Sequence, residues 1–253
     1  MIYRTLKGIT IGMLIMSGCF VLPGNLAASS PSVTEILRQA DKARGNIEGV
    51  IWKVGIEARE KNRTNVITYK VNSRGFDIFA DSLAPPKYKG YKLVMLNGNM
   101  WFYKPGLSKP VPISRRQKLN GKAAYGDIAS TNYADDYKAL QLDDESVDGE
   151  ECYLFDLKSI NRYTTYDRVK YWISKERLVG VQAEYYTVSD KLFKLARMEY
   201  ENRVEVDGQS QAFISRIVIS DKLLSDDITI LSFTEPKLKK LPDYIFNLNL
   251  LRR

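Results

Sequence analysis

Hydrophobic and polar side chains alternate along much of this 253-residue chain with the two-residue period of a β-strand. In residues 50–58 every second position is apolar, from Val50 to Ala58, and Lys53 and Glu57 fall on the other side. Residues 67–71 and 76–80 repeat the pattern. Such segments predict antiparallel strands with one apolar face and one solvated face. Longer strands are predicted over residues 151–158, 166–174, 178–188, 191–204, 211–220 and 228–233.

A β-hairpin is predicted in the middle of the chain. Leu93–Leu96 and Met100–Tyr103 are apolar runs of strand length, and Asn97-Gly98-Asn99 joins them with residues that tolerate positive φ. Short turns with Gly, Asp or Ser separate the later strands. The pattern predicts a mainly β (α+β) protein with about ten antiparallel strands in one strongly curved sheet.

Two helical segments interrupt the strands. Ser32-Val33-Thr34-Glu35 is a capping box, and Gly45 is placed to end the helix that follows. Asn132 is expected to cap a second, short helix that continues to Leu140, with Asp135 and Asp136 in its first turn.

The first 28 residues have the layout of a secretory signal peptide. Arg4 and Lys7 precede an apolar run, Pro23-Gly24 breaks it, and Ala27-Ala28 offers a cleavage site. The run is too short for a membrane span of about 20 residues. An alternative reading treats Met16–Cys19 as a lipobox, with Cys19 lipidated. The rest of the chain, residues 29–253, contains no repeat or linker and is expected to form a single domain.

The amino-acid composition excludes several kinds of catalytic and metal site. The chain contains no histidine, which removes histidine-dependent triads and nearly every zinc site. Cys152 stands alone after signal removal and starts an apolar strand, so it is expected to be a buried hydrophobe. No metal site, cofactor or catalytic residue is predicted. The net charge of +8 suits an anionic lipid surface, and a secreted location argues against nucleic acid.

Several motifs follow one another in an order typical of a known family. The central motifs are Pro85-Pro86, Lys89-Gly90, Trp101-x-Tyr103-x-Pro105 and the basic stretch after Ile113. Three further segments, at Ile36–Gly45, Tyr171–Ser174 and Leu241–Phe246, extend the likeness over nearly the whole mature chain. The chain resembles the LolA-like superfamily of periplasmic outer-membrane lipoprotein-sorting proteins. Residues 29–253 are therefore expected to form an open β half-barrel with helices covering its concave face.

The resemblance implies a function as well as a fold. It implies a periplasmic, non-enzymatic, monomeric carrier that binds acyl chains of lipoproteins or lipids in a hydrophobic cavity and moves them toward the outer membrane. An inner-membrane exporter, an outer-membrane acceptor and transient membrane contact are the expected partners. The alternative is an RseB-like lipoprotein sensor, although such a protein would carry a second domain. One departure concerns Gly126-Asp127-Ile128, where relatives often have Gly-Ser/Thr-Asp-Phe.

Candidate binding residues come from the apolar faces of the predicted strands. An acyl chain needs apolar walls and few hydrogen bonds, and methionine adapts to chains of different shape. The predicted cavity lining is Trp52, Val54, Ile56, Ile67, Tyr69, Met95, Met100, Phe102, Val181, Phe213 and Ile217. The basic residues Arg115, Arg116 and Lys118 are the predicted contact with a partner or membrane.

Overall fold

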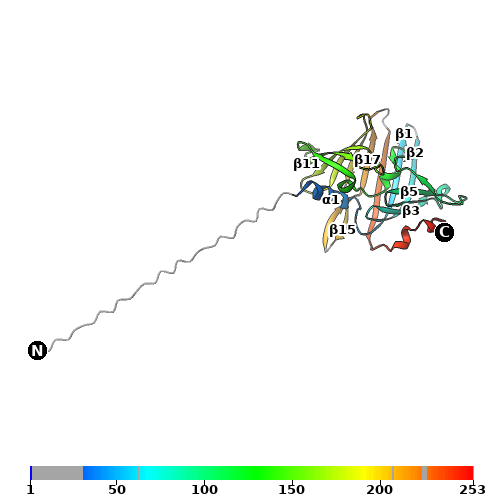
Figure 1. The fold of residues 1–253 in the computed structure, drawn as a ribbon, viewed down its shortest axis with the longest axis horizontal. Helices are drawn as coiled ribbons and strands as arrows, with labels where there is room; N and C mark the ends of the chain where they lie inside the picture. The colour runs from blue at the N-terminus through cyan, green and yellow to red at the C-terminus, as the bar shows by residue number, and fades with distance from the viewer. Residues whose placement is uncertain (2–30, 62, 207, 224–226, 253) are drawn as a thin grey trace. The chain divides into compact units, whose positions relative to one another are not determined.

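The computed structural model describes Met1 and residues 31–253, apart from residues 62, 207, 224–226 and 253 (Figure 1). The predicted signal peptide and Cys19 lie outside the described residues. Within the described part of the chain, no helix has both the length and the apolar character needed to cross a membrane. Two α-helices are present there, α1 (Val33–Ala43) and α2 (Tyr133–Asp136). The short 3-10 helices are η1 (Pro86–Tyr88), η2 (Tyr125–Ile128), η3 (Asp243–Phe246) and η4 (Leu248–Arg252).

Strands dominate the described residues. The first half of the chain holds β1 (Val50–Glu60), β2 (Arg63–Arg74), β3 (Asp77–Ala84), β4 (Lys92–Leu96), β5 (Asn99–Tyr103), β6 (Val111–Ile113), β7 (Lys118–Asn120), β8 (Ala123–Ala124) and β9 (Tyr137–Gln141). The second half holds β10 (Glu145–Val147), β11 (Glu150–Ser159), β12 (Arg168–Ser174), β13 (Gly180–Tyr186), β14 (Leu192–Glu199), β15 (Asn202–Val206), β16 (Gln209–Phe213), β17 (Arg216–Asp221) and β18 (Ile228–Leu238).

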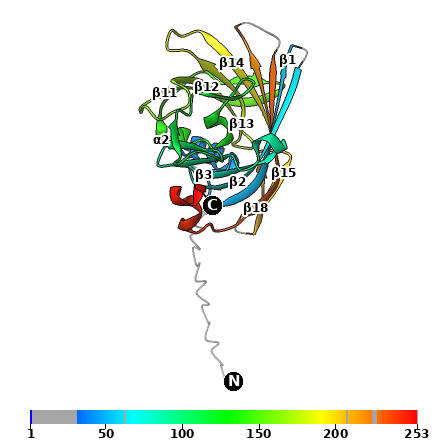
Figure 2. The ribbon, with the colours of Figure 1, turned by 90° about the vertical axis from the view of Figure 1, so that its right-hand side faces the viewer.

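Fourteen of these strands form one curved antiparallel sheet in the order β10-β11-β12-β13-β14-β17-β18-β1-β2-β3-β4-β5-β6, with β9 also paired to β11 (Figure 2). The order has two ends, β6 and β10, that do not pair with each other, so the sheet is open. The described residues therefore contain more sheet strands than the ten or so expected from the sequence. The difference comes from short strands such as β6 and β10, which are too short to show an alternating pattern.

The centre of the sheet follows the predicted alternation. Val54 of β1 lies opposite Tyr69 of β2 and Phe233 of β18, and all three are buried. Directly opposed residues of antiparallel strands share a face, so the apolar sides of neighbouring strands combine into one continuous core. The Trp52 ring lies in this core, with centroids 5.1 Å from Phe233 and 5.4 Å from Phe213.

Two predicted long strands, residues 191–204 and 211–220, are each divided in the structure. β14 ends at Glu199 and β17 begins at Arg216, and between them β15 and β16 leave the sheet and pair only with each other. Side chains satisfy the backbone at this branch point. The Asn202 amide donates to the carbonyls of Ile214 and Phe233, at 2.7 Å and 2.8 Å. These contacts join residues distant in sequence, so a local pattern does not reveal the branch.

The second predicted helix is shorter than expected. α2 ends at Asp136, and Tyr137–Gln141 form β9, which pairs with β11. Asn132 is the N-cap residue, as expected, but its side chain makes no capping hydrogen bond; its side-chain oxygen accepts instead from the Asn46 amide at 3.1 Å. Pairing with an existing strand edge satisfies the backbone of residues 137–141 better than an isolated helical turn does.

The first helix is confirmed in detail. The Ser32 hydroxyl accepts from the Glu35 amide, and the Glu35 carboxylate accepts from the Ser32 amide, which completes the capping box. Ile36, Leu37 and Ala40 are buried on one face of α1. The chain leaves the helix through Gly45, whose φ is +98°, and a Cβ at this position would lie 2.5 Å from the Trp52 ring.

We expect Gly45→Ala to destabilise the protein more than Gly106→Ala. Both glycines have a φ near +90°, but the space around Gly106 is open. Gly106→Ala should therefore cost only the backbone strain, about 1 kcal/mol. Gly45→Ala should cost about 1–3 kcal/mol more because it overpacks the Trp52 ring. Urea unfolding of both variants measures the difference, and equal losses would show that α1 does not pack closely on Trp52.

Candidate functional site

An open cleft of about 1470 Å³ lies among the described residues, and we call it the hairpin cleft. Its lining comes from five places: the end of α1 and the loop after it, the β2–β3 turn, the β12–β13 turn, the β15–β16 hairpin, and the end of β18 with the residues after it. Apolar side chains form much of the lining: Ala43, Ile47, Leu178, Val179, Tyr200, Val204, Val206, Ala212, Phe213 and Leu238. The hairpin supplies apolar surface here because its Val204 and Val206 share one face while Glu205 is exposed.

Charged side chains lie among these apolar ones. The described lining includes six basic residues and three acidic residues: Lys42, Arg74, Arg177, Arg203, Lys239, Lys240, Glu48, Glu176 and Glu205. Arg177 also forms a bidentate ion pair, at 2.8 Å and 2.6 Å, with Glu150, which is not part of the lining. The cleft thus combines apolar surface with an excess of positive charge, which suits an amphipathic molecule with a negative end.

The structure collects the predicted cavity residues into one packed core instead of along this cleft. Ten of the eleven are buried, and Phe102 is partly buried against them. Only Phe213 also lines the hairpin cleft. Phe213 contacts the Trp52 ring, so the cleft floor and the core are adjacent at this point. The assignment of these residues to an acyl cavity stays a prediction.

Sequence reasoning missed most of the cleft lining. Val204, Val206 and Ala212 belong to the hairpin, which the sequence pattern merged with β14 and β17. The alternation of Val204, Glu205 and Val206 was a usable signal, because it continues past the point where β14 ends. The sequence predicts Leu178 and Val179 at the start of a strand over residues 178–188, but β13 begins at Gly180, so both lie in the turn before it.

A second, smaller hollow of about 30 Å³ lies inside the fold, and we call it the interior polar pocket. Four tyrosines line it, together with two arginines and two aspartates: Tyr133, Tyr137, Tyr166, Tyr185, Arg44, Arg115, Asp127 and Asp136. The rings of Tyr166 and Tyr185 stack with centroids 3.9 Å apart. The pocket is therefore walled by aromatic rings and contains ionisable groups of both signs.

The polar contacts between α1 and the α2 region lie beside this pocket. Asp41 is buried, and one of its carboxylate oxygens accepts from the Ala134 amide at 2.9 Å. Asn46 donates to the Thr131 carbonyl at 3.0 Å, and Arg38 pairs with Asp135 at 3.2 Å on the surface. Burial raises the pKa of Asp41 to about 6, against the lowering effect of the hydrogen bond from the Ala134 amide. The helix is thus joined to α2 by a few polar contacts, one of which titrates near neutral pH.

Several buried polar atoms near α1 have no hydrogen-bond partner among the described residues. They include Asp41 Oδ1, Arg44 Nε, Thr131 Oγ1, Tyr171 Oη and Tyr200 Oη. Each such atom costs about 1–3 kcal/mol. Arg44, at the end of α1, donates a side-chain hydrogen bond from Nη1 to the Met198 sulfur at 3.3 Å. The inner side of α1 therefore lies against polar groups whose hydrogen bonds are incomplete.

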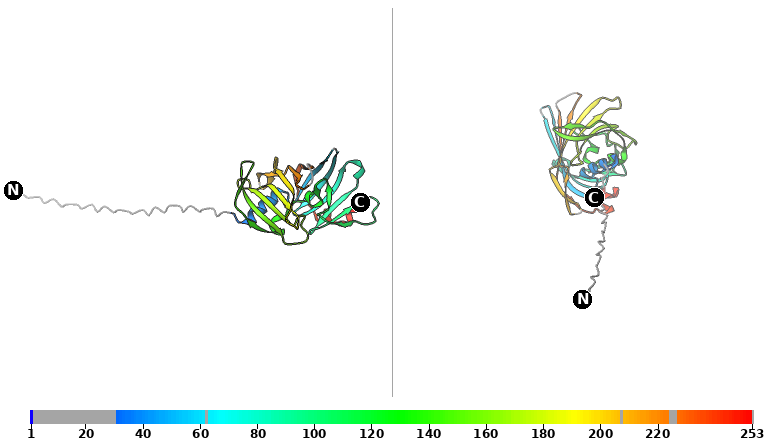
Figure 3. Two further views of the ribbon diagram at one scale, coloured as in Figure 1. Left: turned by 90° about the horizontal axis from the view of Figure 1, so that it is seen from above. Right: turned by 90° about the vertical axis from the view of Figure 1, so that its left-hand side faces the viewer.

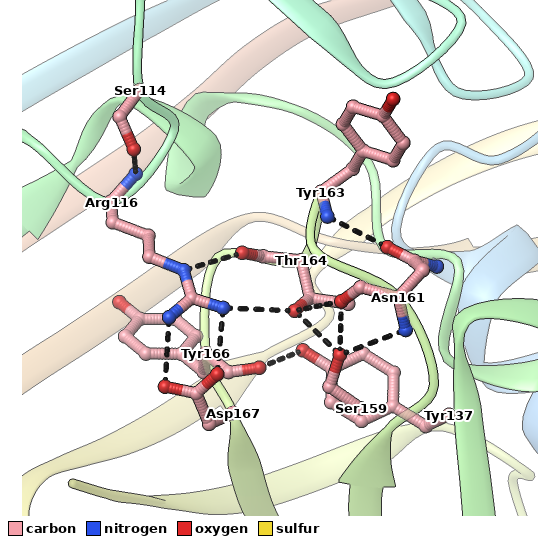
Figure 4. A network of polar contacts seen from close by, with 9 residues as sticks. All are labelled: Ser114, Arg116, Tyr137, Ser159, Asn161, Tyr163, Thr164, Tyr166 and Asp167. Atoms are coloured by element: carbon pink, nitrogen blue, oxygen red, sulfur yellow. Dashed lines mark hydrogen bonds and ion pairs between the residues drawn. The ribbon is translucent and has the colours of Figure 1, made fainter. Parts of the chain in front are cut away.

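The predicted contact residues Arg115, Arg116 and Lys118 have different surroundings. Arg116 forms a two-pronged ion pair with Asp167, at 2.8 Å and 2.7 Å, and donates to the Thr164 carbonyl (Figure 4). Lys118 pairs with Glu60 at 2.8 Å. Arg115 is only 8% exposed and stacks over the Phe76 ring, so it faces the interior. A surface role stays a prediction for Arg116 and Lys118, while the burial of Arg115 removes it from the surface in this structure.

Cys152 is fully buried, as the sequence predicts. Burial raises the pKa of its thiol to about 11, so the thiolate needed for nucleophilic chemistry is scarce at neutral pH. No group of three or more potential metal ligands occurs within the part of the chain that the structure describes.

Solved structures with the same fold indicate the superfamily of this chain. The chain is 30% identical to a LolA superfamily protein from Nitrosomonas europaea, with a TM-score of 0.78, 87% of this chain and 100% of that chain covered. A family model described only as an uncharacterized protein matches residues 78–253. No curated protein matches the sequence. On the identity and coverage of the Nitrosomonas protein, the chain belongs to the LolA superfamily.

Two more distant structures share the fold. One is a putative outer membrane lipoprotein-sorting protein domain from Vibrio parahaemolyticus, 16% identical, with a TM-score of 0.74 over 87% of this chain and 98% of that chain. The other is a DUF1329 family protein from Desulfovibrio piger, 19% identical, with a TM-score of 0.72 over 86% and 97%. The open antiparallel sheet is thus common to proteins of low sequence identity.

We expect Asp41→Asn to change how stability depends on pH. A carboxyl with a raised pKa binds its proton more tightly in the folded state, so its contribution falls as pH rises from about 4 through about 6. The shift from 3.8 to about 6 corresponds to about 3 kcal/mol. Asparagine keeps the acceptor for Ala134 but does not ionise. Thermal melts should therefore show the variant more stable than the parent at pH 7.5 and similar to it at pH 4.

The matched control is Asp135→Asn, because Asp135 belongs to the same helix pair but its side chain is 61% exposed. That variant should show no such pH dependence. A constant difference between Asp41→Asn and the parent from pH 4 to pH 8 would contradict a buried, titrating Asp41.

Proposed function

We propose that this protein is a periplasmic carrier, without enzymatic activity, that binds acyl chains of lipids or lipoproteins and moves them toward the outer membrane. The observation that carries the proposal is the hairpin cleft of about 1470 Å³ with its apolar lining, in a chain of the LolA superfamily. The Vibrio protein with the same fold, described as a putative outer membrane lipoprotein-sorting protein domain, is in keeping with a lipoprotein cargo.

The energetics suit an acyl ligand. Each methylene moved from water into an apolar site contributes about 0.8 kcal/mol, and a methylene needs no hydrogen-bond partner. The cleft is larger than the roughly 300–1,000 Å³ of typical small-molecule sites, so it has room for long chains. The basic residues around it would meet the negative groups of a lipid or of a membrane surface.

A carrier must also release its cargo, and α1 is the element we propose to move. Figure 3 draws α1 inside the curve of the sheet, which supports a role as a cover for the concave face. The unpartnered polar atoms beneath it would gain partners when the helix shifts, and this gain would partly offset the lost packing. Small differential contacts of this kind are enough to shift a two-state element.

This movement would connect the hairpin cleft with the core residues that the sequence predicts as cavity lining. Phe213 belongs to both, and its neighbour Trp52 lies directly below Gly45 at the end of α1. We propose that an acyl chain enters at the hairpin, passes Phe213 and Trp52, and reaches the apolar faces of β1 and β2 when α1 is displaced.

We expect Ala212→Trp to weaken acyl binding without unfolding the protein. Ala212 is half-buried in the cleft lining, so an indole there would occupy the space of the ligand. Titration with a fluorescent fatty acid should show at least a tenfold loss of affinity. The control is Val188→Trp, an 85% exposed position outside the cleft, which should bind like the parent. Normal binding by a folded Ala212→Trp protein would exclude the hairpin cleft as the site.

The proposed location has its own test. We expect the mature protein to begin near Ser29, because the capped helix α1 starts at Val33 and leaves little chain for a lipid tether. N-terminal sequencing of the secreted protein should give this start. Palmitate label incorporated at Cys19 and lost in Cys19→Ala would contradict it and indicate a lipid-anchored acceptor.

A further inference from the structure

The interior polar pocket contains hydrogen-bond donors that the protein does not use. Arg115 donates from Nη2 to the Thr165 hydroxyl at 3.3 Å, while its Nε and Nη1 have no partner among the described residues. Arg44 lines the same pocket, is 5% exposed, and has an unpartnered Nε. A buried guanidinium normally pairs with a carboxylate. Neither arginine makes a hydrogen bond of that kind within the described residues.

The two carboxylates that line the pocket are engaged by other groups. Asp127 accepts from the Tyr166 hydroxyl at 2.9 Å and from the Ala124 amide at 2.8 Å. Asp136 accepts from the Asn161 amide at 2.9 Å. Their charges balance those of the arginines, but their hydrogen bonds leave the arginine N–H groups unused. The pocket is thus close to neutral in charge and rich in donors.

The size of the pocket limits what can use these donors. A volume of about 30 Å³ corresponds to roughly two water-sized atoms. A carboxylate presents two oxygens and matches guanidinium donors in geometry, whereas a phosphate group presents more oxygens and needs more room. The aromatic walls suit the apolar chain that follows the carboxylate.

Both hollows are lined by residues at the end of α1. Ala43 lines the hairpin cleft and the next residue, Arg44, lines the interior polar pocket. Tyr200 of the cleft also interacts electrostatically with Arg44. A displacement of α1 that admits an acyl chain would therefore open a direct path from the cleft to the arginines.

We propose that the interior polar pocket binds the carboxylate of a fatty acid, with Arg115 as the main donor and Arg44 at the entrance. The proposal rests on the proposed acyl-carrier function and narrows its cargo to acyl chains with a free carboxylate. Arg115 is then a ligand-binding residue inside the fold, although sequence reasoning assigned it to a surface contact.

The test compares ligands of equal chain length on the mature parent protein. Competition against a fluorescent fatty acid at pH 7.5 gives affinities for palmitate, hexadecanol and hexadecyl phosphate. Palmitate should bind at least tenfold more tightly than either of the others. Equal affinities for palmitate and hexadecanol, or tighter binding of hexadecyl phosphate, would overturn the proposal. Absence of binding by all three would instead overturn the carrier function, so the two failures are distinguishable.

Variants then assign the preference to a residue. Arg115→Gln should lose the tenfold preference for palmitate and keep the affinity for hexadecanol, and Arg115→Lys should retain part of the preference. Arg116→Gln is the matched control, because its neighbouring guanidinium is held by Asp167 outside the pocket, and it should behave like the parent. A preference that survives in Arg115→Gln would overturn the role of Arg115. If Arg115→Gln does not fold, the ligand comparison on the parent and on Arg115→Lys still decides.

A final experiment tests whether the pocket binds a carboxylate that carries no long acyl chain. Acetate at millimolar concentration should raise the melting temperature of the parent but not that of Arg115→Gln, because the pocket accepts the carboxylate itself. An equal rise in both proteins would show that acetate acts elsewhere and would count against the pocket.

Discussion

An open curved sheet must have its apolar face covered, and this requirement determines most of the structure. Fourteen strands bring their apolar sides to a common core, but the two ends of the sheet do not pair to enclose it. The end of α1 packs on Trp52, and Trp52 in turn contacts Phe213 of the hairpin and Phe233 of β18. One indole therefore links the helix, the hairpin and the centre of the sheet.

Helix α1 is bound to the rest of the fold by strong apolar packing but by incomplete polar contacts. The apolar residues Ile36, Leu37 and Ala40 of α1 are buried, whereas Asp41, buried beside them, titrates near neutral pH and lies among polar atoms without partners in the described residues. Packing alone would make a rigid lid, and unsatisfied polar groups alone would make an unstable one. Their combination suits an element that stays closed without cargo and can be displaced by it.

Much of the fold could be predicted from the sequence because its signals are local. The capping box at Ser32, the alternation in β1 and the Asn97-Gly98 turn each depend on neighbouring residues, and each is present as expected. The break between β14 and β15, and that between β16 and β17, could not be predicted, since the hydrogen bonds of Asn202 join residues far apart in the chain. The same holds for Arg115, whose sequence neighbours are polar and whose burial follows from its contacts with Phe76 and Thr165. The candidate site lies mainly at such long-range junctions, so the sequence identified its chemistry better than its residues.

An open sheet also leaves strand edges that could recruit a second copy of the chain. One edge is β6, only three residues long, where Pro112 lies opposite Trp101 of β5. Proline has no amide hydrogen to offer a new strand, and a neighbouring Pro110 shortens the usable edge further. At the other end, β9 and β10 share the edge of β11, so neither offers a long straight ladder. Interrupted edges of this kind hinder strand addition and aggregation, so the sheet can stay open without polymerising through its edges.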